Sequence, residues 1–537
     1  MIYYTPASER TLSLFKTPFD QSLSPENRWV KMAELVPWDE MAKVFFSSLS
    51  SNMGRPTVDL RIVLGTLLVK HLENLTDEDT ISYIQENIYA QYFVGLSSFQ
   101  IEPVFVPSLF VEIRKRLGKE GAAKLNDLLI NQAQALKVVK HRRRPGDGKP
   151  PVDPPQSPKK EQAADQENQE SPQSEQPTNR GTLMVDATVS PVNIAYPTDT
   201  RLLAEARLKS EALIDALFES ARELWPKKPR TYRRKARQNY VSFSKKRRKD
   251  KKSVRKATGQ QLRYVRRNLK TIEGMLDKLE EAEKSIPWTA TQWKHLWVIQ
   301  ELYRQQEIMY RDKRRQIDNR LVSIDKPMVR PIKRGKGGTK NTEFGPKINA
   351  SMSEGIARVD QIDFNAFNEA KYLKDQIEAY KSLYGYYPAE VLADQIYWTR
   401  ENRKYLKDRG IKHNGPVVGR KKKQSKSERD KARKRNNKRS EIEGKFGQAK
   451  IRYGLDKIQA KLSQTIPAEV HLIFLAMNLL KVHLSGVSLP FLFFAQALYR
   501  ACDKFWEEIL DRISDCYALF CQHPAWDRKR TPVALTF

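Results

Sequence analysis

Apolar residues along the first 140 positions recur at the three- and four-residue spacings of amphipathic helices. Thr76 followed by Asp77 is typical of a helix start, because a threonine side chain can accept a hydrogen bond from the first free backbone amides. The widest apolar face comprises Leu60, Val63, Leu64, Leu67, Leu68 and His71. The pattern predicts an all-α domain over residues 1–140.

The periodicity stops at residue 144. Residues 144–178 are rich in Pro, Gln, Ser and Glu and contain almost no large apolar side chain, so they cannot offset the entropy lost on ordering. We expect a disordered linker over 141–180. A short β-prone run, 182–186, follows and ends in Asp186, before a loop around Ser190. This run predicts that Asp186 lies at or near the end of a strand.

Helical spacing returns over residues 200–320. A helix is expected from Leu203 to Trp225, followed by the basic stretch 227–256. Two runs with heptad spacing come next, and Thr289 with Gln292 matches a capping box between them. Their apolar positions are Leu262, Val265, Leu269, Ile272, Leu276 and Leu279, then Leu296, Tyr303, Tyr310 and Ile317. A long antiparallel helical hairpin turning at Pro287 is predicted, either structural or a DNA-binding or dimerising arm, which the adjoining basic stretch slightly favours.

From residue 322 the pattern changes to short strands interleaved with helices, which indicates an α/β domain. The glycine-rich piece 335–338 lacks the GxxxxGK[ST] spacing and is interpreted as a hairpin turn with some phosphate contact. Strands are expected over 328–332, 344–351, 357–364 and 389–393, the last followed by Asp394, and helices over 368–384, 398–409 and from 466 onward.

A basic tract over 420–439 leads into a helix that carries Glu443. At about 100° per residue, Arg439, Glu443 and Lys450 fall within roughly 40° of one another, while Glu441 lies nearly opposite. The core-facing stripe beside them is Ile442, Phe446, Ala449 and Tyr453. The helix presents Glu443 at its margin, either as a functional acid or as a surface residue in an ordinary i,i+4 ion pair.

The overall charge favours a polyanionic partner. The chain has 537 residues and 96 Lys and Arg against 64 Asp and Glu, a formal charge of +32, which makes nucleic acid the first candidate and an anionic membrane surface the second. No signal peptide is recognised, so a cytoplasmic protein is expected. The most apolar segment, 469–498, is interrupted by Lys481, His483 and Pro490, which favours a buried helix pair over a membrane span. The three cysteines, Cys502, Cys516 and Cys521, support neither a disulfide framework nor a zinc ribbon.

Asp186, Asp394 and Glu443 come from separate elements and can converge at one end of a sheet. Three adjacent carboxylates repel one another unless a hard cation lies between them, so this set predicts two Mg²⁺ ions, with Mn²⁺ as a possible substitute. Such a site suits in-line phosphodiester chemistry. Spacing alone does not select Asp186 over Asp199.

Several blocks resemble the DDE transposases of bacterial insertion sequences. GRPTVDLRI at 54–62, LLVKHLE at 67–73 and QYFVGL at 91–96 look like their helical N-terminal domain. VDATVSPVNI at 185–194 with YPTD at 196–199, EFGPK at 343–347, LADQIY at 392–397 with RENR at 400–403, and GPVVGR at 415–420 are similar to their catalytic blocks in order. The family signature Tyr-x2-Arg-x3-Glu-x6-Lys is matched by Arg439, Glu443 and Lys450, with Asn436 in place of Tyr.

The resemblance implies a ribonuclease H-like catalytic domain over 181–485, with 200–320 as a helical insertion, and a C-terminal helical region over 486–537. It implies that Asp186, Asp394 and Glu443 are catalytic metal ligands, that Arg439 and Lys450 bind DNA, and that residues 1–140 bind element ends. The expected activity is cleavage of terminal inverted repeats and joining of 3′-hydroxyls to target DNA, by a homodimer in the bacterial cytoplasm near the nucleoid. The alternatives are an inactive DNA-binding derivative and a ribonuclease H-like nuclease without strand transfer.

Overall fold

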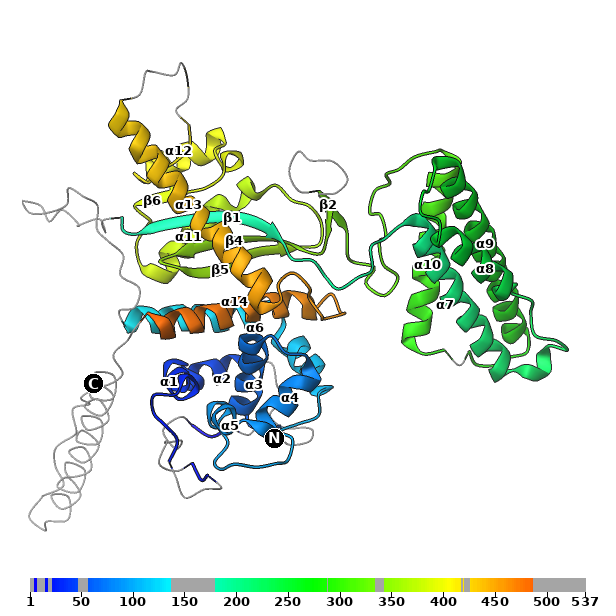
Figure 1. Ribbon diagram of the computed structural model, residues 1–537, viewed down its shortest axis with the longest axis horizontal. Coiled ribbons are helices and arrows are strands. Elements are labelled where there is room, and N and C mark those ends of the chain that lie inside the picture. The colour runs from blue at the N-terminus through cyan, green and yellow to red at the C-terminus, as the bar shows by residue number, and fades with distance from the viewer. Residues whose placement is uncertain are drawn as a thin grey trace, which may run out of the picture.

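The computed structural model describes residues 4–6, 15–17, 22–46, 57–136, 179–286, 288–333, 342–416, 419 and 425–485 (Figure 1). Several predicted features lie outside these residues: nearly all of the linker over 141–180, Pro287, the glycine-rich piece 335–338, most of the basic tract before 425, the three cysteines and the C-terminal region 486–537.

Helices fill the described part of the N-terminal region, as predicted. The face predicted from Leu60 to His71 is buried throughout, and Thr76 caps the next helix by accepting a hydrogen bond from the backbone N–H of Asp79. The helices are α1 (Arg28–Leu35), α2 (Trp38–Phe46), α3 (Leu60–Glu73), α4 (Asp77–Glu86), α5 (Ile88–Val94) and α6 (Leu109–Ala135).

The central element of the α/β part is a mixed five-stranded sheet with the order β5-β4-β1-β6-β7. The middle strand β1 is antiparallel to β4 and parallel to β6. The strands are β1 (Thr182–Val189), β4 (Lys347–Ser353), β5 (Ile356–Asp363), β6 (Glu390–Leu392) and β7 (Lys412–His413), with a separate ribbon of β2 (Pro331–Lys333) and β3 (Thr342–Phe344).

One strand end differs from the prediction. β1 continues through Val189, because Thr188 and Val189 pair with Ile348 and Lys347 of β4, so Asp186 lies inside the strand rather than at its end. The strand expected over 328–332 is also displaced, to Pro331–Lys333.

Helices cover both faces of the sheet (Figure 1). On one face, α11 (Leu373–Tyr384) and α12 (Arg400–Asp408) pack against Leu183 and Val391. On the other face, α13 (Lys426–Tyr453) and α14 (Thr465–Leu484) pack against Met184 and Leu392. Two short 3₁₀ turns, Glu369–Tyr372 and Gln395–Tyr397, precede α11 and α12.

Helix α14 belongs to two cores at once. Leu472 and Leu479 lie in the core of the N-terminal helices, whereas Phe474 and Met477 lie in the core beneath α13. α14 is long and apolar enough to cross a membrane, but 83% of its most apolar window is buried inside the protein, as in a core helix. The expectation of a buried helix is confirmed for this segment; the second helix of the expected pair lies outside the described residues.

A buried asparagine fixes α14 to its neighbours. Asn478 accepts a hydrogen bond from the Ala357 N–H at 3.0 Å and donates to the Ala357 carbonyl oxygen at 2.6 Å and to Asn126 of α6 at 2.8 Å. Buried polar groups without partners are costly, so this network holds α6, α14 and β5 in one register.

Residues 199–311 form a four-helix bundle beside the sheet (Figure 1). The predicted hairpin is confirmed as α9 (Lys251–Glu281) and α10 (Ala290–Arg311), including the Thr289–Gln292 capping box. α10 ends at Arg311, so Ile317, the last position of the expected heptad run, lies beyond the helix. α7 (Asp199–Ser220) packs along α9, and α8 (Arg233–Ser244) lies within the basic stretch and contacts α9. A 3₁₀ turn, Arg222–Leu224, follows α7, so the helix expected up to Trp225 ends at Ser220.

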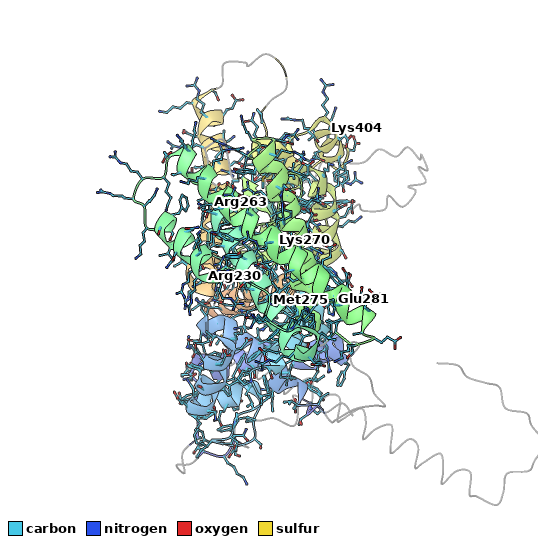
Figure 2. All side chains as sticks on the ribbon, turned by 90° about the vertical axis from the view of Figure 1, so that its right-hand side faces the viewer. Arg230, Arg263, Lys270, Met275, Glu281 and Lys404 are labelled. Carbon is cyan, nitrogen blue, oxygen red and sulfur yellow. The ribbon has the colours of Figure 1, made fainter. Side chains whose placement is uncertain are left out.

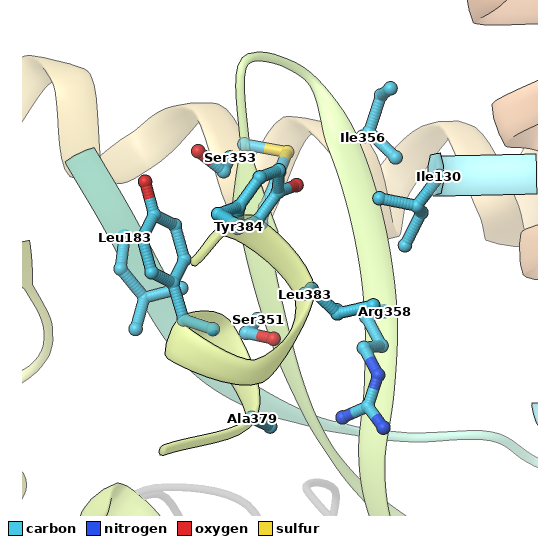
Figure 3. Close-up of a pocket in the computed structure, with 11 residues that line it drawn as sticks. Ile130, Leu183, Ser351, Ser353, Ile356, Arg358, Ala379, Leu383 and Tyr384 are labelled. Carbon is cyan, nitrogen blue, oxygen red and sulfur yellow. The ribbon is translucent and has the colours of Figure 1, made fainter. Parts of the chain in front are cut away.

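A small pocket lies where α6, β1, β4, β5 and α11 meet (Figure 3). Its wall is mostly apolar, with Leu183 and Tyr384 on one side and Ile130 and Ile356 on the other. The charged group in the wall, Arg358, already pairs with Asp127 at 2.8 Å and with Asp360 at 2.6 Å. The pocket is therefore a packing gap between elements and offers no unpaired charge to a ligand.

Candidate active site

The alternation of strand side chains brings two of the predicted acids to one face of the sheet. Met184 and Leu392 point into the core under α13, while Leu183 and Val391 point to the opposite core. Side chains two residues apart share a face, so Asp186, two residues after Met184, projects toward α13. Asp394 follows β6 by two residues and lies at the end of this neighbouring parallel strand.

Helix α13 supplies the third acid. Ser425 and Glu428 form a capping box at its start, and Gly454, with φ of 75°, ends it. Its buried residues are Ile442, Phe446, Ala449 and Tyr453, which is the predicted stripe. Glu443 stands beside this stripe with a side chain 51% exposed. The predicted presentation of Glu443 at the helix margin is confirmed.

Arg439 joins two of the acids. Its guanidinium lies 2.7 Å from an Asp394 carboxylate oxygen and 3.0 Å from a Glu443 carboxylate oxygen, while its own side chain is only 19% exposed. The i,i+4 ion pair considered from the sequence therefore exists, but the same guanidinium also reaches the acid that follows β6. A largely buried cation between two half-exposed carboxylates compensates their mutual repulsion.

Asp186 is the most buried of the three acids. Burial raises its pKa to about 6; the Ala187 N–H, which donates to its carboxylate at 2.8 Å, opposes this, and the charges of Asp394 and Glu443 add to it. Arg439 also acts to lower the pKa. The three predicted acids are thus close enough to influence one another electrostatically.

Two asparagines border the acids, and only Asn436 was singled out from the sequence, whereas Asn414 was not. Asn414 clamps the residue before Asp394: its carboxamide accepts from the Ala393 N–H at 3.0 Å and donates to the Ala393 carbonyl oxygen at 3.1 Å. The same amide group lies 3.5 Å from the side-chain oxygen of Asn436, a long contact. The position where the family signature fails therefore lies next to the loop that holds Asp394.

Lys450 lies farther along α13. Seven residues separate it from Glu443, about 10 Å along the helix axis. Its ammonium group is 3.5 Å from a carboxylate oxygen of Glu343 in β3. Arg439 thus pairs with two of the acids, Asp394 and Glu443, whereas Lys450 stands about two helical turns beyond Glu443 and contacts Glu343.

The two aromatic residues after Asp394 belong to the core. Tyr397 is 1% exposed and donates a hydrogen bond to Asn349 at 2.8 Å, and Trp398 stacks on His413 with ring centroids 4.9 Å apart. Both side chains therefore pack in the core beneath the loop that carries Asp394.

The donor set of the site fits a hard divalent cation. All three acids offer carboxylate oxygens, which are the ligands that Mg²⁺ and Mn²⁺ accept. Burial first, and the charges of Asp394 and Glu443 second, raise the pKa of Asp186, and a cation bound beside it would favour its ionised form. Within the described ranges, no three His, Cys, Asp or Glu side chains are close enough together to enclose an ion, and Arg439 supplies the positive charge in the arrangement seen.

The half-buried Asp186 carboxyl should make the stability of the fold depend on pH. Its pKa is raised on folding, so the ionised carboxylate destabilises the folded state as pH rises from about 4 through 6. In metal-free buffer, Asp186→Asn should raise the free energy of unfolding by about 1–2 kcal/mol at pH 8 and by little at pH 4, after allowance for partial exposure. Thermal unfolding of both proteins at the two pH values checks this. Equal stability at pH 8 would show that the buried charge has no folding cost.

Two family models match the chain. Residues 17–116 match the transposase domain (DUF772), which covers α1 to α5 and the start of α6, and residues 391–480 match the transposase DDE domain, which covers Asp394, Arg439, Glu443 and Lys450. The chain belongs to the DDE transposases of insertion sequences. This transposase is also 30% identical over 193 residues to the uncharacterised protein ORF8 in the nfe locus of Rhizobium meliloti, across 36% of the chain and 75% of that protein. No solved structure matches it.

The two family models do not span the whole candidate site. Asp186 and the four-helix bundle fall between the two matched regions, so the transposase models alone do not assign them. What connects Asp186 to the other acids is the geometry: a central strand that faces α13 and runs parallel to β6.

Proposed function

We propose that this transposase binds the terminal inverted repeats of its insertion sequence, cleaves the DNA ends by metal-dependent hydrolysis and joins the 3′-hydroxyls to target DNA. The observation that supports this most strongly is the convergence of Asp186, Asp394 and Glu443 from β1, the end of β6 and α13, with Arg439 among them. In this proposal the three acids are the catalytic metal ligands.

The cofactor proposed is a pair of Mg²⁺ ions, which Mn²⁺ could replace. Bound there, two such ions would activate a water or 3′-hydroxyl and stabilise the oxygen that leaves. The protein supplies the three carboxylates on rigid elements: a central strand, a strand end clamped by Asn414 and a helix packed by four buried side chains. Rigid placement favours the in-line geometry that phosphoryl transfer requires.

The cations of α13 are proposed to bind DNA phosphates near the scissile bond. Arg439 offers a planar guanidinium that can donate hydrogen bonds to two phosphate oxygens at once, and Lys450 offers a point charge about 10 Å beyond Glu443 along the helix. Arg439 would then both offset the negative charge of the acids and position the DNA strand. Lys450 would bind the DNA backbone at a phosphate that lies farther from the acids.

We further propose that different regions of the chain have different functions. Residues 1–140 bind the element ends, residues 181–485 form a ribonuclease H-like catalytic domain with 200–320 as an insertion, and the enzyme acts in the cytoplasm near the nucleoid as a homodimer that pairs two ends. A mixed five-stranded sheet with helices on both faces supports the catalytic assignment. Because α14 lies in the cores of both parts, it would hold an element end bound by the N-terminal helices at a fixed position relative to the catalytic domain.

The decisive assay uses a labelled duplex that carries an inverted repeat found in the DNA flanking the coding region. The wild-type transposase should cut it with Mg²⁺ and then yield joined products with a target plasmid. Asp394→Asn should bind the duplex as tightly as wild type does and cut it at least about a thousandfold more slowly. Retained cleavage by Asp394→Asn would refute the metal-ligand role. Cut ends without any joined product would indicate a simple nuclease, and binding without any product would indicate an inactive DNA-binding protein.

A further inference from the structure

The four-helix bundle carries a one-sided concentration of positive charge. Residues 227–256 contain 16 Lys and Arg and a single acid, Asp250. The first twenty residues of α9, from 251 to 270, contain eight Lys and Arg and no acid. An ordinary solvated helix surface mixes both signs, because crowded like charges repel one another and destabilise the fold.

Many of these cations have no acidic partner in the described structure. Arg233 pairs with Asp215 at 2.7 Å, and Lys228 also pairs with Asp215, at 2.9 Å. Within the bundle as described, no ion pair or hydrogen bond involves the side chains of Arg234, Lys235, Arg237, Arg263 and Lys270, all of which are exposed. Their positive charge is therefore available to an external anion.

One part of this surface is held rigidly. Tyr232 precedes α8 with φ of 56°, and its ring lies between the guanidinium groups of Arg230, at 4.7 Å from the centroid, and Arg267, at 4.4 Å. Asn239 of α8 donates a hydrogen bond to Tyr264 of α9 at 3.1 Å. Cations fixed in this way lose less side-chain entropy when they bind phosphate than free lysines do.

The surface faces away from the transposase's own sheet. Figure 2 views the bundle from the side remote from the sheet, and Arg230, Arg263 and Lys270 are distributed along this side. In Figure 1, α8 and α9 are likewise the outer helices of the bundle. We define the basic face as the exposed Lys and Arg of residues 230–237 together with those of 251–270. DNA bound there would be a different segment from the one held at the acids of the same subunit.

We propose that the basic face binds the phosphate backbone of duplex DNA at a site separate from the three acids. This inference rests on the proposed function, because it assigns a second DNA contact to the same enzyme. The basic part of α9 is about 30 Å long, close to one helical turn of duplex DNA at about 34 Å. Tyr232, 40% exposed, lies within the basic face, but the guanidinium groups of Arg230 and Arg267 lie over its ring. Among the described residues of α8 and α9, no large apolar side chain is prominently exposed, and membrane docking would require several. The contact is independent of sequence, since it reaches phosphates and not bases.

The test compares two full-length triple variants with wild type. Arg230→Gln with Arg263→Gln and Lys270→Gln removes three charges from the basic face. The matched control, Lys371→Gln with Lys404→Gln and Lys407→Gln, removes three exposed charges beside and on α12. Both are checked for wild-type thermal unfolding. The probe is a duplex of about 40 base pairs of arbitrary sequence, titrated at several salt concentrations.

The basic-face variant should bind this duplex at least tenfold more weakly near 0.15 M salt, with the slope of log affinity against log salt reduced by about 2 to 3. The control should bind as wild type does. Equal losses in both variants, an unchanged slope, or tighter wild-type binding to phosphatidylserine vesicles than to the duplex would each overturn the proposal. Binding is measured without divalent ions, so a failure of the cleavage assay leaves this result unaffected and the two proposals are judged separately.

Discussion

Replacing Glu443 by Gln should abolish metal-dependent cleavage of an inverted-repeat duplex, with a rate loss of at least about a thousandfold. Glutamine keeps the size of the side chain and one oxygen but removes the negative charge that a divalent ion requires. The loss should appear in the rate at saturating DNA and not in DNA affinity, because Glu443 faces the acids and carries the wrong sign to bind phosphate.

The chain offers an internal control two residues away. Glu441 is exposed on nearly the opposite side of the same helix. Glu441→Gln changes the net charge by the same amount but should leave cleavage within about twofold of wild type. If both variants lose activity equally, the effect comes from the charge or stability of α13, and Glu443 is not a metal ligand. If neither loses activity, the proposed acid set is wrong.

Adding Mn²⁺ gives a second readout of the same variant. When a substitution weakens metal binding, the residual activity rises with the concentration of the ion. When activity is lost because the protein unfolds, it does not. Glu443→Gln should therefore show a raised metal requirement for any residual activity, while Glu441→Gln should follow the wild-type metal titration. An identical titration for all three proteins would contradict direct ligation.

The sequence predicted those parts of the site that depend on local periodicity. The stripe from Ile442 to Tyr453 repeats at the spacing of one helix face, so the orientation of Glu443 could be worked out without any partner element. The position of Asp394 just after a strand was likewise readable from a short β-prone run. Both depend only on neighbours within a few residues.

The parts that were missed depend on contacts between distant segments. β1 extends beyond Asp186 because β4, some 160 residues later, pairs with Thr188 and Val189. Asn414 is placed by its hydrogen bonds to Ala393, and no residue pattern near position 414 encodes them. Arg439 was recognised as a cation on the right helix face, but its reach to Asp394 depends on how α13 crosses the end of β6.

The bundle illustrates the same limit at a larger scale. Heptad spacing predicted α9 and α10 and their capped turn. It did not predict that α7 packs on α9, because α7 repeats apolar residues like any amphipathic helix and gives no sign of its partner. α8 was not predicted either, because it lies in the basic stretch and its only buried residues, Ala236 and Phe243, are too few to show a helical apolar pattern.

The stability of the four-helix bundle depends on a buried ion pair. Arg207 and Glu211 of α7 form an ion pair at 2.6 Å with side chains only 2% and 6% exposed. Arg207→Ala should lower the free energy of unfolding by about 3–5 kcal/mol, because it leaves the Glu211 carboxylate buried without its cation. The measurement is denaturant unfolding of the full chain, followed by the fluorescence of the bundle tryptophans.

Two further variants distinguish the contribution of the ion pair from the cost of leaving one charge buried without a partner. Arg207→Met combined with Glu211→Leu removes both charges and keeps the volume, so it should cost much less than Arg207→Ala and could be neutral. Arg304→Ala breaks the Arg304–Glu301 pair on α10, whose side chains are 59% and 41% exposed, and should cost no more than about 1 kcal/mol. If the double variant is as unstable as the single one, the ion pair itself stabilises the bundle. Because the basic face is built on α8 and α9, which pack on α7, a bundle weakened by Arg207→Ala should also lose duplex affinity, whereas the double variant should retain it.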